Sequence, residues 1–270
     1  MEINCNHIQY TEFSTGKNEI FDLSCSFSDK KVYGIIGNSG SGKSTLLELI
    51  AQEKQPTFGE IEINHNQLFD ARTIGYLKQN IENQFITMSV KEELKYLLLS
   101  FSYRVNEIDK RMVEVLKLVG LSEKYLDRNI HSLSHGEIKK LGLASVLIYN
   151  PKILLLDEPS FGLSPIDKKN LIKLLKKLKN KYHKLIIIVS QDMEFIHKVC
   201  DDIYVLNQGK IVLYGNKFDV FSKQKLLKKI NVDVPNIISF ENLVLQKKNI
   251  QIGYRDEIND LIKDVYRYVK

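Results

Sequence analysis

The segment GIIGNSGSGKSTLLELI, residues 34–50, contains glycine, lysine and hydroxyl side chains at spacings that suit phosphate groups. It fits the pattern G-x-x-x-x-G-K-[ST], directly after a short apolar run and directly before a helical pattern, and this context indicates a nucleoside triphosphate loop. Glycines let backbone N–H groups turn inward, and the positive end of the following helix strengthens the anion site. The residues predicted to bind the nucleotide are Gly37, Asn38, Ser39, Gly40, Ser41, Gly42, Lys43, Ser44 and Thr45.

Two side chains of this loop are predicted to have distinct roles. Lys43 is expected to place its charge between the outer phosphates, and the Ser44 hydroxyl is expected to reach a Mg²⁺ ion, which usually keeps several waters and few protein ligands. The alternative is a chance glycine-rich turn. The lysine, the serine, the preceding apolar run and the following helical pattern together argue against it.

A pair of carboxylates follows another apolar run, in KILLLDEP at 152–159. Asp157 and Glu158 would then lie at the tip of a buried strand. Asp157 is expected to hold Mg²⁺, mostly through water. Glu158 is expected to polarise the attacking water as a general base. The pair alone would be weak evidence, but downstream of a phosphate loop in a parallel sheet it indicates nucleotide hydrolysis.

The strands that must position these groups are visible as short apolar runs. Residues 31–36, 152–157 and 185–189 are nearly continuous in apolar side chains, which is typical of parallel strands buried on both faces. Residues 59–64 alternate like a strand with one wet face, and 201–215 predict a hairpin.

Helical periodicity lies between these runs. Residues 89–101 begin at Ser89 with the spacing of a capping box, and 106–120 end at Gly120 as a C-terminal stop. A third helical pattern, at 167–184, has a lysine-covered side that is read as a solvated face, with membrane headgroup contact as the alternative. Strands and helices in alternation predict an α/β fold with a mostly parallel sheet and a helical insertion at about 84–150.

Composition limits the class of protein. The 270 residues are 43% hydrophobic and 27% charged, which is typical of globular chains. The net charge of +6 permits an anionic partner without demanding nucleic acid. Cys5, Cys25 and Cys200 have no metal-site spacing and favour a reducing compartment. Because neither a signal peptide nor an apolar run of about 20 residues is visible, we expect a cytoplasmic location.

Further motifs connect the two parts of the site. Residues 133–165, LSHGEIKKLGLASVLIYNPKILLLDEPSFGLSP, contain a serine-glycine-acid turn that opens a helix, then an Asn-Pro break, a strand and Asp-Glu-Pro. This order resembles the nucleotide-binding subunits of ATP-binding-cassette (ABC) transporters, and the resemblance runs from about residue 3 to 215. The stretches at 79–85 and 220–235 are similar to the energy-coupling-factor ATPases, which drive uptake of vitamins or transition-metal ions.

The resemblance implies a P-loop fold of the ABC type. It would have a mostly parallel core sheet, an N-terminal antiparallel β subdomain, the inserted helical subdomain and a small C-terminal appendage. The implied division places the ABC ATPase domain at 1–215 and the appendage at 216–270.

The resemblance also implies roles for individual residues. Gln79 matches the glutamine that reaches the magnesium ion and the attacking water. Phe13 matches the aromatic residue that stacks on adenine, with Tyr10 as a competing candidate and a core aromatic as the plain alternative. The family's signature turn, which faces the partner subunit's ATP, corresponds to Ser134, His135, Gly136 and Glu137.

Three residues depart from the family's pattern. Gln191 stands where the family has a histidine that contacts the far phosphate, and His135 stands where it usually has glycine, a position at which positive φ could be needed. His135 could attract phosphate if protonated, or the turn could have lost function. Ser164 replaces an aspartate that helps couple the two subunits. These departures predict impaired or asymmetric turnover.

Implied partners follow from the same resemblance. They are a second ABC ATPase, favouring a heterodimer, and two membrane proteins, one integral coupling protein and one that binds the substrate. The chain would lie peripherally on the cytoplasmic face of the cell membrane, and no nucleic acid is expected. The alternatives are a regulatory subunit that binds ATP and scarcely cleaves it, and a soluble ABC protein acting on ribosomes or DNA.

Overall fold

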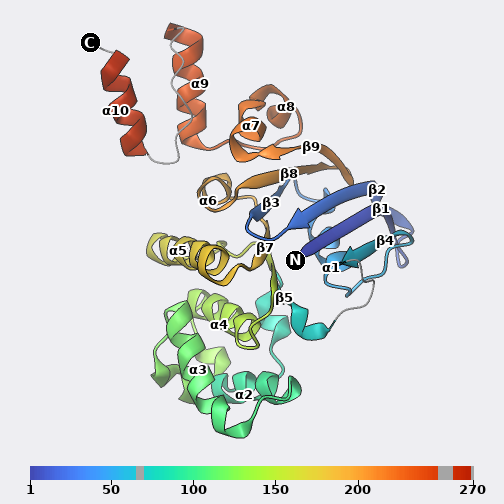
Figure 1. Ribbon diagram of the computed structural model, residues 1–270, viewed down its shortest axis with the longest axis vertical. Coiled ribbons are helices and arrows are strands. Elements are labelled where there is room, and N and C mark those ends of the chain that lie inside the picture. The colour runs from blue at the N-terminus through green and yellow to red at the C-terminus, as the bar shows by residue number, and fades with distance from the viewer. Residues whose placement is uncertain (65–69, 249–257, 269–270) are drawn as a thin grey trace.

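The computed structural model describes residues 1–64, 70–248 and 258–268 (Figure 1). Two sheets form the centre of the described chain. The smaller is antiparallel, and its strands, in spatial order, are β2 (Lys17–Ser28), β1 (Glu2–Glu12) and β4 (Phe58–Ile63). This sheet is the antiparallel N-terminal β structure that the resemblance implied.

The larger sheet has six strands and is parallel except at one edge. In spatial order they are β5 (Ile74–Leu77), β6 (Ile153–Asp157), β7 (Leu185–Val189), β3 (Val32–Ile36), β8 (Asp202–Asn207) and β9 (Lys210–Asn216). Only β9 runs antiparallel, as the second arm of the predicted hairpin. Every residue of β3, β6 and β7 is buried, because helices cover one face and the small sheet with α1 covers the other. The predicted α/β class is confirmed.

Helices fill the spaces around the sheets. Helix α1 (Lys43–Ile50) packs with the small sheet, and α2 (Val90–Ser100), α3 (Val105–Val119) and α4 (His135–Leu147) group at one end of the molecule (Figure 1). The predicted caps are correct, since the Ser89 hydroxyl accepts a hydrogen bond from the Glu92 N–H, and Gly120 ends α3 at φ +81°. The short 3₁₀ turns are η1 (Ala71–Thr73), η2 (Ile81–Gln84), η3 (Glu123–Asp127) and η4 (Ile130–Ser132).

Helices α5 (Pro165–Tyr182) and α6 (Met193–Val199) precede and follow β7. Beyond β9 the described chain is helical, and this end lies far from α2–α4 in Figure 1. Its helices are α7 (Lys217–Ser222), α8 (Gln224–Lys229), α9 (Asn236–Lys248) and α10 (Ile258–Tyr268). The domain division at residue 215 stays a prediction.

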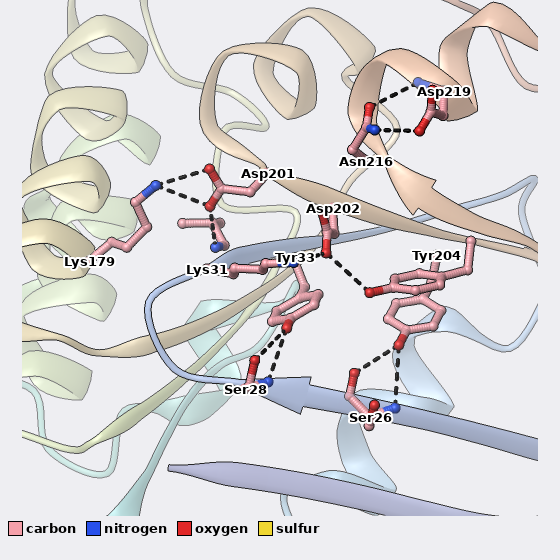
Figure 2. Close-up of polar contacts among 12 residues, drawn as sticks. Ser26, Ser28, Lys31, Tyr33, Lys179, Asp201, Asp202, Tyr204, Asn216 and Asp219 are labelled. Atoms are coloured by element: carbon pink, nitrogen blue, oxygen red, sulfur yellow. Dashed lines mark hydrogen bonds and ion pairs between the residues drawn. The ribbon is translucent and has the colours of Figure 1, made fainter.

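Polar contacts around the start of β3, the strand that leads into the phosphate loop, are drawn in Figure 2. The Asp201 carboxylate accepts the Val32 N–H at 2.7 Å and the Lys179 ammonium at 3.0 Å, so it joins the start of β3 to α5. Its neighbour Asp202 accepts Lys31 at 2.6 Å and the Tyr214 hydroxyl at 3.1 Å. These bonds anchor the start of β3, the strand that leads into the phosphate loop, to α5 and to the start of β8.

None of the helices in the described ranges is both long and apolar enough to cross a membrane.

Candidate active site

The predicted site residues gather at the carboxyl ends of three neighbouring strands. Strand β3 leads into the phosphate loop, and β7 lies between β3 and β6. Asp157, the last residue of β6, pairs with Val189, the last residue of β7. Since parallel strands end at the same edge of a sheet, Asp157 at the end of β6, Glu158 just after it, and Ser190 and Gln191 just after β7 lie at the edge from which the loop starts.

The phosphate loop is held by its own lysine. The Lys43 ammonium donates to the carbonyls of Gly37 at 2.9 Å and Asn38 at 2.7 Å. Burial lowers the pKa of Lys43, while the charges of Glu158 and Asp157 raise it. The ammonium is therefore placed inside the curl of the loop, on the side of the carboxylates.

Glycine is required in this loop for two different reasons. Gly42 precedes α1 in a left-handed conformation, φ +94°, which side chains rarely adopt. A Cβ atom on Gly37 would lie 2.1 Å from the carbonyl oxygen of Leu206 on β8. The loop runs so close to the backbone of the neighbouring strand that position 37 has no room for a side chain.

Asp157 has the features of a metal-binding carboxylate. Its side chain is buried, and its Oδ1 atom has no hydrogen-bond partner in the part of the chain that the structure describes. Burial raises the pKa of this carboxyl, and the hydrogen bond from Ser44 and the charge of Lys43 lower it by less. A buried oxygen without a donor, beside a serine hydroxyl, suits an oxygen-coordinated cation such as Mg²⁺.

Glu158 is held by two donors from the next strand. Its Oε2 atom accepts the Ser190 hydroxyl and its Oε1 atom accepts the Gln191 N–H, each at 2.9 Å. Burial raises the pKa of Glu158, and these two bonds oppose that shift. The backbone of Glu158 is left-handed at φ +47°, an unfavourable conformation for a residue with a Cβ atom. The carboxylate is thus fixed in one direction at a strained position.

Gln191 reaches the phosphate loop directly. Its side-chain amide donates to the Ser39 hydroxyl at 3.2 Å, and both groups are at the surface. The amide therefore lies next to the predicted phosphate site, where the resemblance placed a histidine.

Gln79 and Phe13 are both exposed, and each lies in a segment that follows a strand. Gln79 follows β5, and its carbonyl accepts a hydrogen bond from Lys139. Phe13 is in the β1–β2 turn with 87% of its surface exposed, whereas Tyr10 is 4% exposed and donates to Glu12. Of the two aromatic candidates, only Phe13 has a ring that is open to a ligand.

The serine turn at 134–137 forms a complete capping box at the start of α4. The Ser134 hydroxyl accepts the Glu137 N–H, and the Glu137 carboxylate accepts the Ser134 N–H at 2.7 Å. The expectation that position 135 could need positive φ is wrong, because His135 is the first helical residue and has ordinary α geometry. Its ring lies beside Gly162, where a Cβ atom would come within 2.5 Å of it.

Ser164 can perform one structural role of the aspartate that is usual at this position, which is to cap the following helix. Its hydroxyl caps α5 by accepting the Asp167 N–H at 3.1 Å. A serine is a good N-cap, so the turn before α5 is preserved although the negative charge is lost.

Two residues of the site were missed by the sequence analysis. Ser190 could have been noticed as the hydroxyl that ends an apolar strand next to Gln191. Lys139 gave no signal, because its type and spacing match the exposed lysines elsewhere in the chain. The structure buries it to 4% exposure, with its ammonium near the backbone of Glu158.

Comparison with known proteins agrees with this geometry. The sequence model of the family described as "ABC transporter" matches residues 20–161. An energy-coupling factor transporter ATP-binding protein, EcfA2, from Caldanaerobacter subterraneus subsp. tengcongensis is 33% identical over 86% of this chain and 83% of its own length.

Two solved structures are similar in fold and sequence. The cbiO1 protein from Clostridium perfringens, described as part of the ABC transporter complex cbiONQ, has a TM-score of 0.73 at 28% identity and covers 89% of this chain and 98% of its own. The cassette MJ0796, in a dimeric post-hydrolysis state bound to ADP and Pi, has a TM-score of 0.72 at 27% identity. It covers 79% of this chain and 98% of its own.

Proposed function

Because the chain belongs to the ABC transporter family of ATPases, we propose that it is the ATP-hydrolysing subunit of an energy-coupling-factor type uptake transporter, with vitamins or metal ions as the transported class. The observation that supports hydrolysis most directly is the pair at the end of β6. Asp157 has a buried oxygen that accepts no hydrogen bond from the described residues, and the Glu158 carboxylate is oriented by Ser190 and Gln191.

The roles of the side chains follow from their positions. The loop amides from Gly37 to Thr45 and the Lys43 ammonium bind the phosphates, Phe13 stacks on the adenine, and Glu158 accepts a proton from the attacking water. Mg²⁺ would be held by Ser44 and Asp157 with Gln79 nearby, and when bound it neutralises phosphate charge.

We propose a heterodimer with a second ABC ATPase, facing head to tail. Gln191 adjoins this chain's own phosphate loop, whereas Ser134, His135, Gly136 and Glu137 would face the partner's ATP. In a heterodimer with an ordinary partner, each ATP site would contain one altered motif; in a homodimer, each would contain both. Pairing with an ordinary partner is therefore the arrangement that preserves more activity.

The proposed setting is the cytoplasmic face of the membrane. There the ATPase pair would bind an integral coupling protein and, through it, a membrane protein that selects the solute. Tagging this chain in its native cell, extracting with mild detergent and identifying co-purified proteins tests the assembly. Recovery of a second ABC ATPase with integral membrane proteins supports it, and recovery with ribosomes or alone contradicts it.

A second candidate is a regulatory subunit that binds ATP and hydrolyses it very slowly. The observation in its favour is Gln191, because an amide donates a hydrogen bond without carrying charge. Glu158→Gln in the purified complex separates the two functions. We expect single-turnover hydrolysis at this site to fall by about 10²–10⁴ with ATP binding retained. If the Glu158→Gln complex keeps its ATPase and uptake activities, this chain's own site does not hydrolyse ATP, and the regulatory function is supported instead.

A further inference from the structure

Lys139 is a buried cation that the roles above do not use. It lies one turn into α4, and its side chain is 4% exposed. Its ammonium donates to the carbonyl oxygen of Glu158 at 3.2 Å and to the carbonyl oxygen of Gln79 at 3.4 Å. Burying a cation is costly unless its donors are used, so these two carbonyls are the groups that keep the ammonium in place.

Both acceptors belong to residues whose side chains are expected beside the attacking water. The strands β5 and β6 that precede them are adjacent, but Gln79 and Glu158 lie beyond the paired residues of these strands. In the described chain, the Lys139 ammonium therefore bridges two backbone segments past the end of the sheet ladder.

The contact to Glu158 also bears on its backbone strain. Glu158 has φ +47°, and a residue with a Cβ atom stays in this region only when its surroundings fix it. Its N–H donates to the Val189 carbonyl at 2.9 Å, and its own carbonyl accepts both the Phe161 N–H and the Lys139 ammonium, each at 3.2 Å. These bonds hold the peptide groups on both sides of the strained residue and so help to set the direction of its carboxylate. Lys139 adds a bond from α4 to the local turn bond from Phe161.

We propose that Lys139 is a positioning residue for ATP hydrolysis: it ties the backbone of Gln79 to that of Glu158 and holds both in the geometry that orients the attacking water. It touches neither ATP nor water itself. Since α4 begins at the serine turn that would face the partner's ATP, Lys139 also connects that helix to this chain's own general base. This inference rests on hydrolysis at this chain's own site.

The test is a set of variants in the detergent-extracted native complex. Lys139→Met keeps the length of the side chain and removes its donors. We expect kcat for hydrolysis at this site to fall about tenfold or more, since small displacements of reacting groups have effects up to about 10². The ATP concentration at half-maximal rate should change less than about threefold, because the phosphate loop is untouched.

Two further variants distinguish positioning from a general packing effect. Lys139→Arg should restore most of the turnover, because guanidinium can donate to two carbonyls and the adjoining cavity, about 260 Å³ and bordered by Leu143 and Leu174, has room for it. Lys140→Met is the matched control, since Lys140 lies next in the same helix and its ammonium pairs with Asp167 at 2.6 Å. It should keep normal kcat.

Several outcomes would overturn the proposal. One is normal kcat in Lys139→Met; another is an equal loss in Lys140→Met; a third is no recovery in Lys139→Arg while its thermal unfolding is normal. If Lys139→Met does not fold, Lys139→Gln takes its place, with a smaller expected loss of kcat.

Glu158→Gln is measured in parallel. If this variant hydrolyses ATP normally, the proposed catalytic site and this inference fail together. If Glu158→Gln loses hydrolysis while Lys139→Met keeps normal kcat, only this inference is overturned.

Discussion

The side-chain amide of Gln191 donates a hydrogen bond to the hydroxyl of Ser39 at 3.2 Å, joining the end of β7 to the middle of the phosphate loop. The bond is made at the surface, on the side where phosphate is expected to enter. The same residue also donates its backbone N–H to Glu158 at 2.9 Å. Gln191 therefore connects Glu158, the proposed general base, to the phosphate loop, although its side chain lacks the charge that an imidazolium could supply.

Replacing this amide by imidazole should increase turnover. Gln191→His is expected to raise single-turnover hydrolysis at this chain's own site by about tenfold or more, because one transition-state contact is typically worth about 10²–10³ in rate. Gln191→Ala should lower hydrolysis further, because it removes the donor.

Gln9→His is a suitable control, since Gln9 is exposed on β1. Equal rates for the wild-type, Gln191→His and Gln191→Ala complexes would mean that the side chain at position 191 does not act on the phosphate.

The buried carboxylate Asp157 should reduce the stability of the ligand-free protein at neutral pH. Burial raises its pKa above the ordinary value of 3.8, so the native state binds this proton more tightly than the unfolded chain. The cost of ionised Asp157 is present above the native pKa and disappears as pH falls towards 3.8. Asp157→Asn should therefore raise the unfolding temperature at pH 7.5, with no gain near pH 4. A rise of about 2–4 °C corresponds to about 1 kcal/mol in a chain of this length.

Asp167→Asn is the control, because its expected effect on stability has the opposite sign to that of Asp157→Asn. The hydrogen bond from Lys140 lowers the pKa of Asp167, with a smaller effect from Ser164, so its stabilisation is present above its ordinary pKa. Asp167→Asn should lower the unfolding temperature at pH 7.5. Both measurements use thermal unfolding with a chelator and without nucleotide. A decrease for Asp157→Asn at pH 7.5 would contradict the predicted sign.

The exposed ring of Phe13 should contribute to ATP affinity and little to folding. Stacking of a base on an aromatic side chain is worth about 1–3 kcal/mol, so Phe13→Ala should raise the Kd for ATP about tenfold or more. Phe13→Tyr should bind normally, because stacking needs only the flat face of the ring.

Thermal unfolding should not change in Phe13→Ala, since the ring is 87% exposed. Tyr10→Phe is the matched control, and it should leave the Kd unchanged because Tyr10 is buried. Normal ATP affinity in Phe13→Ala, measured by calorimetry, would assign adenine stacking to another residue.

The sequence by itself determined the class of fold and predicted the phosphate loop. Gly37 to Ser44 needs only local order, since the glycines, Lys43 and Ser44 act within one turn and the following helix. The apolar runs before Gly37 and Asp157 were also sufficient to place both motifs at strand ends, because continuous burial leaves few other structures for such short segments. The caps at Ser89 and Gly120 were readable for the same local reason.

The tertiary structure decided which groups meet. The strand order places β7 between β3 and β6, and this order brings Gln191 to Ser39 and Ser190 to Glu158. Lys139 shows most clearly what the sequence could not predict. Lys139 and Lys140 are neighbouring lysines on α4, yet Lys139 is bonded to Glu158 inside the protein and Lys140 to Asp167 near the surface. Both residues are lysines on the same helix. Only the packing of α4 against the ends of β5 and β6 therefore separates a lysine bonded to the backbone of Glu158, the proposed general base, from one that forms an ion pair.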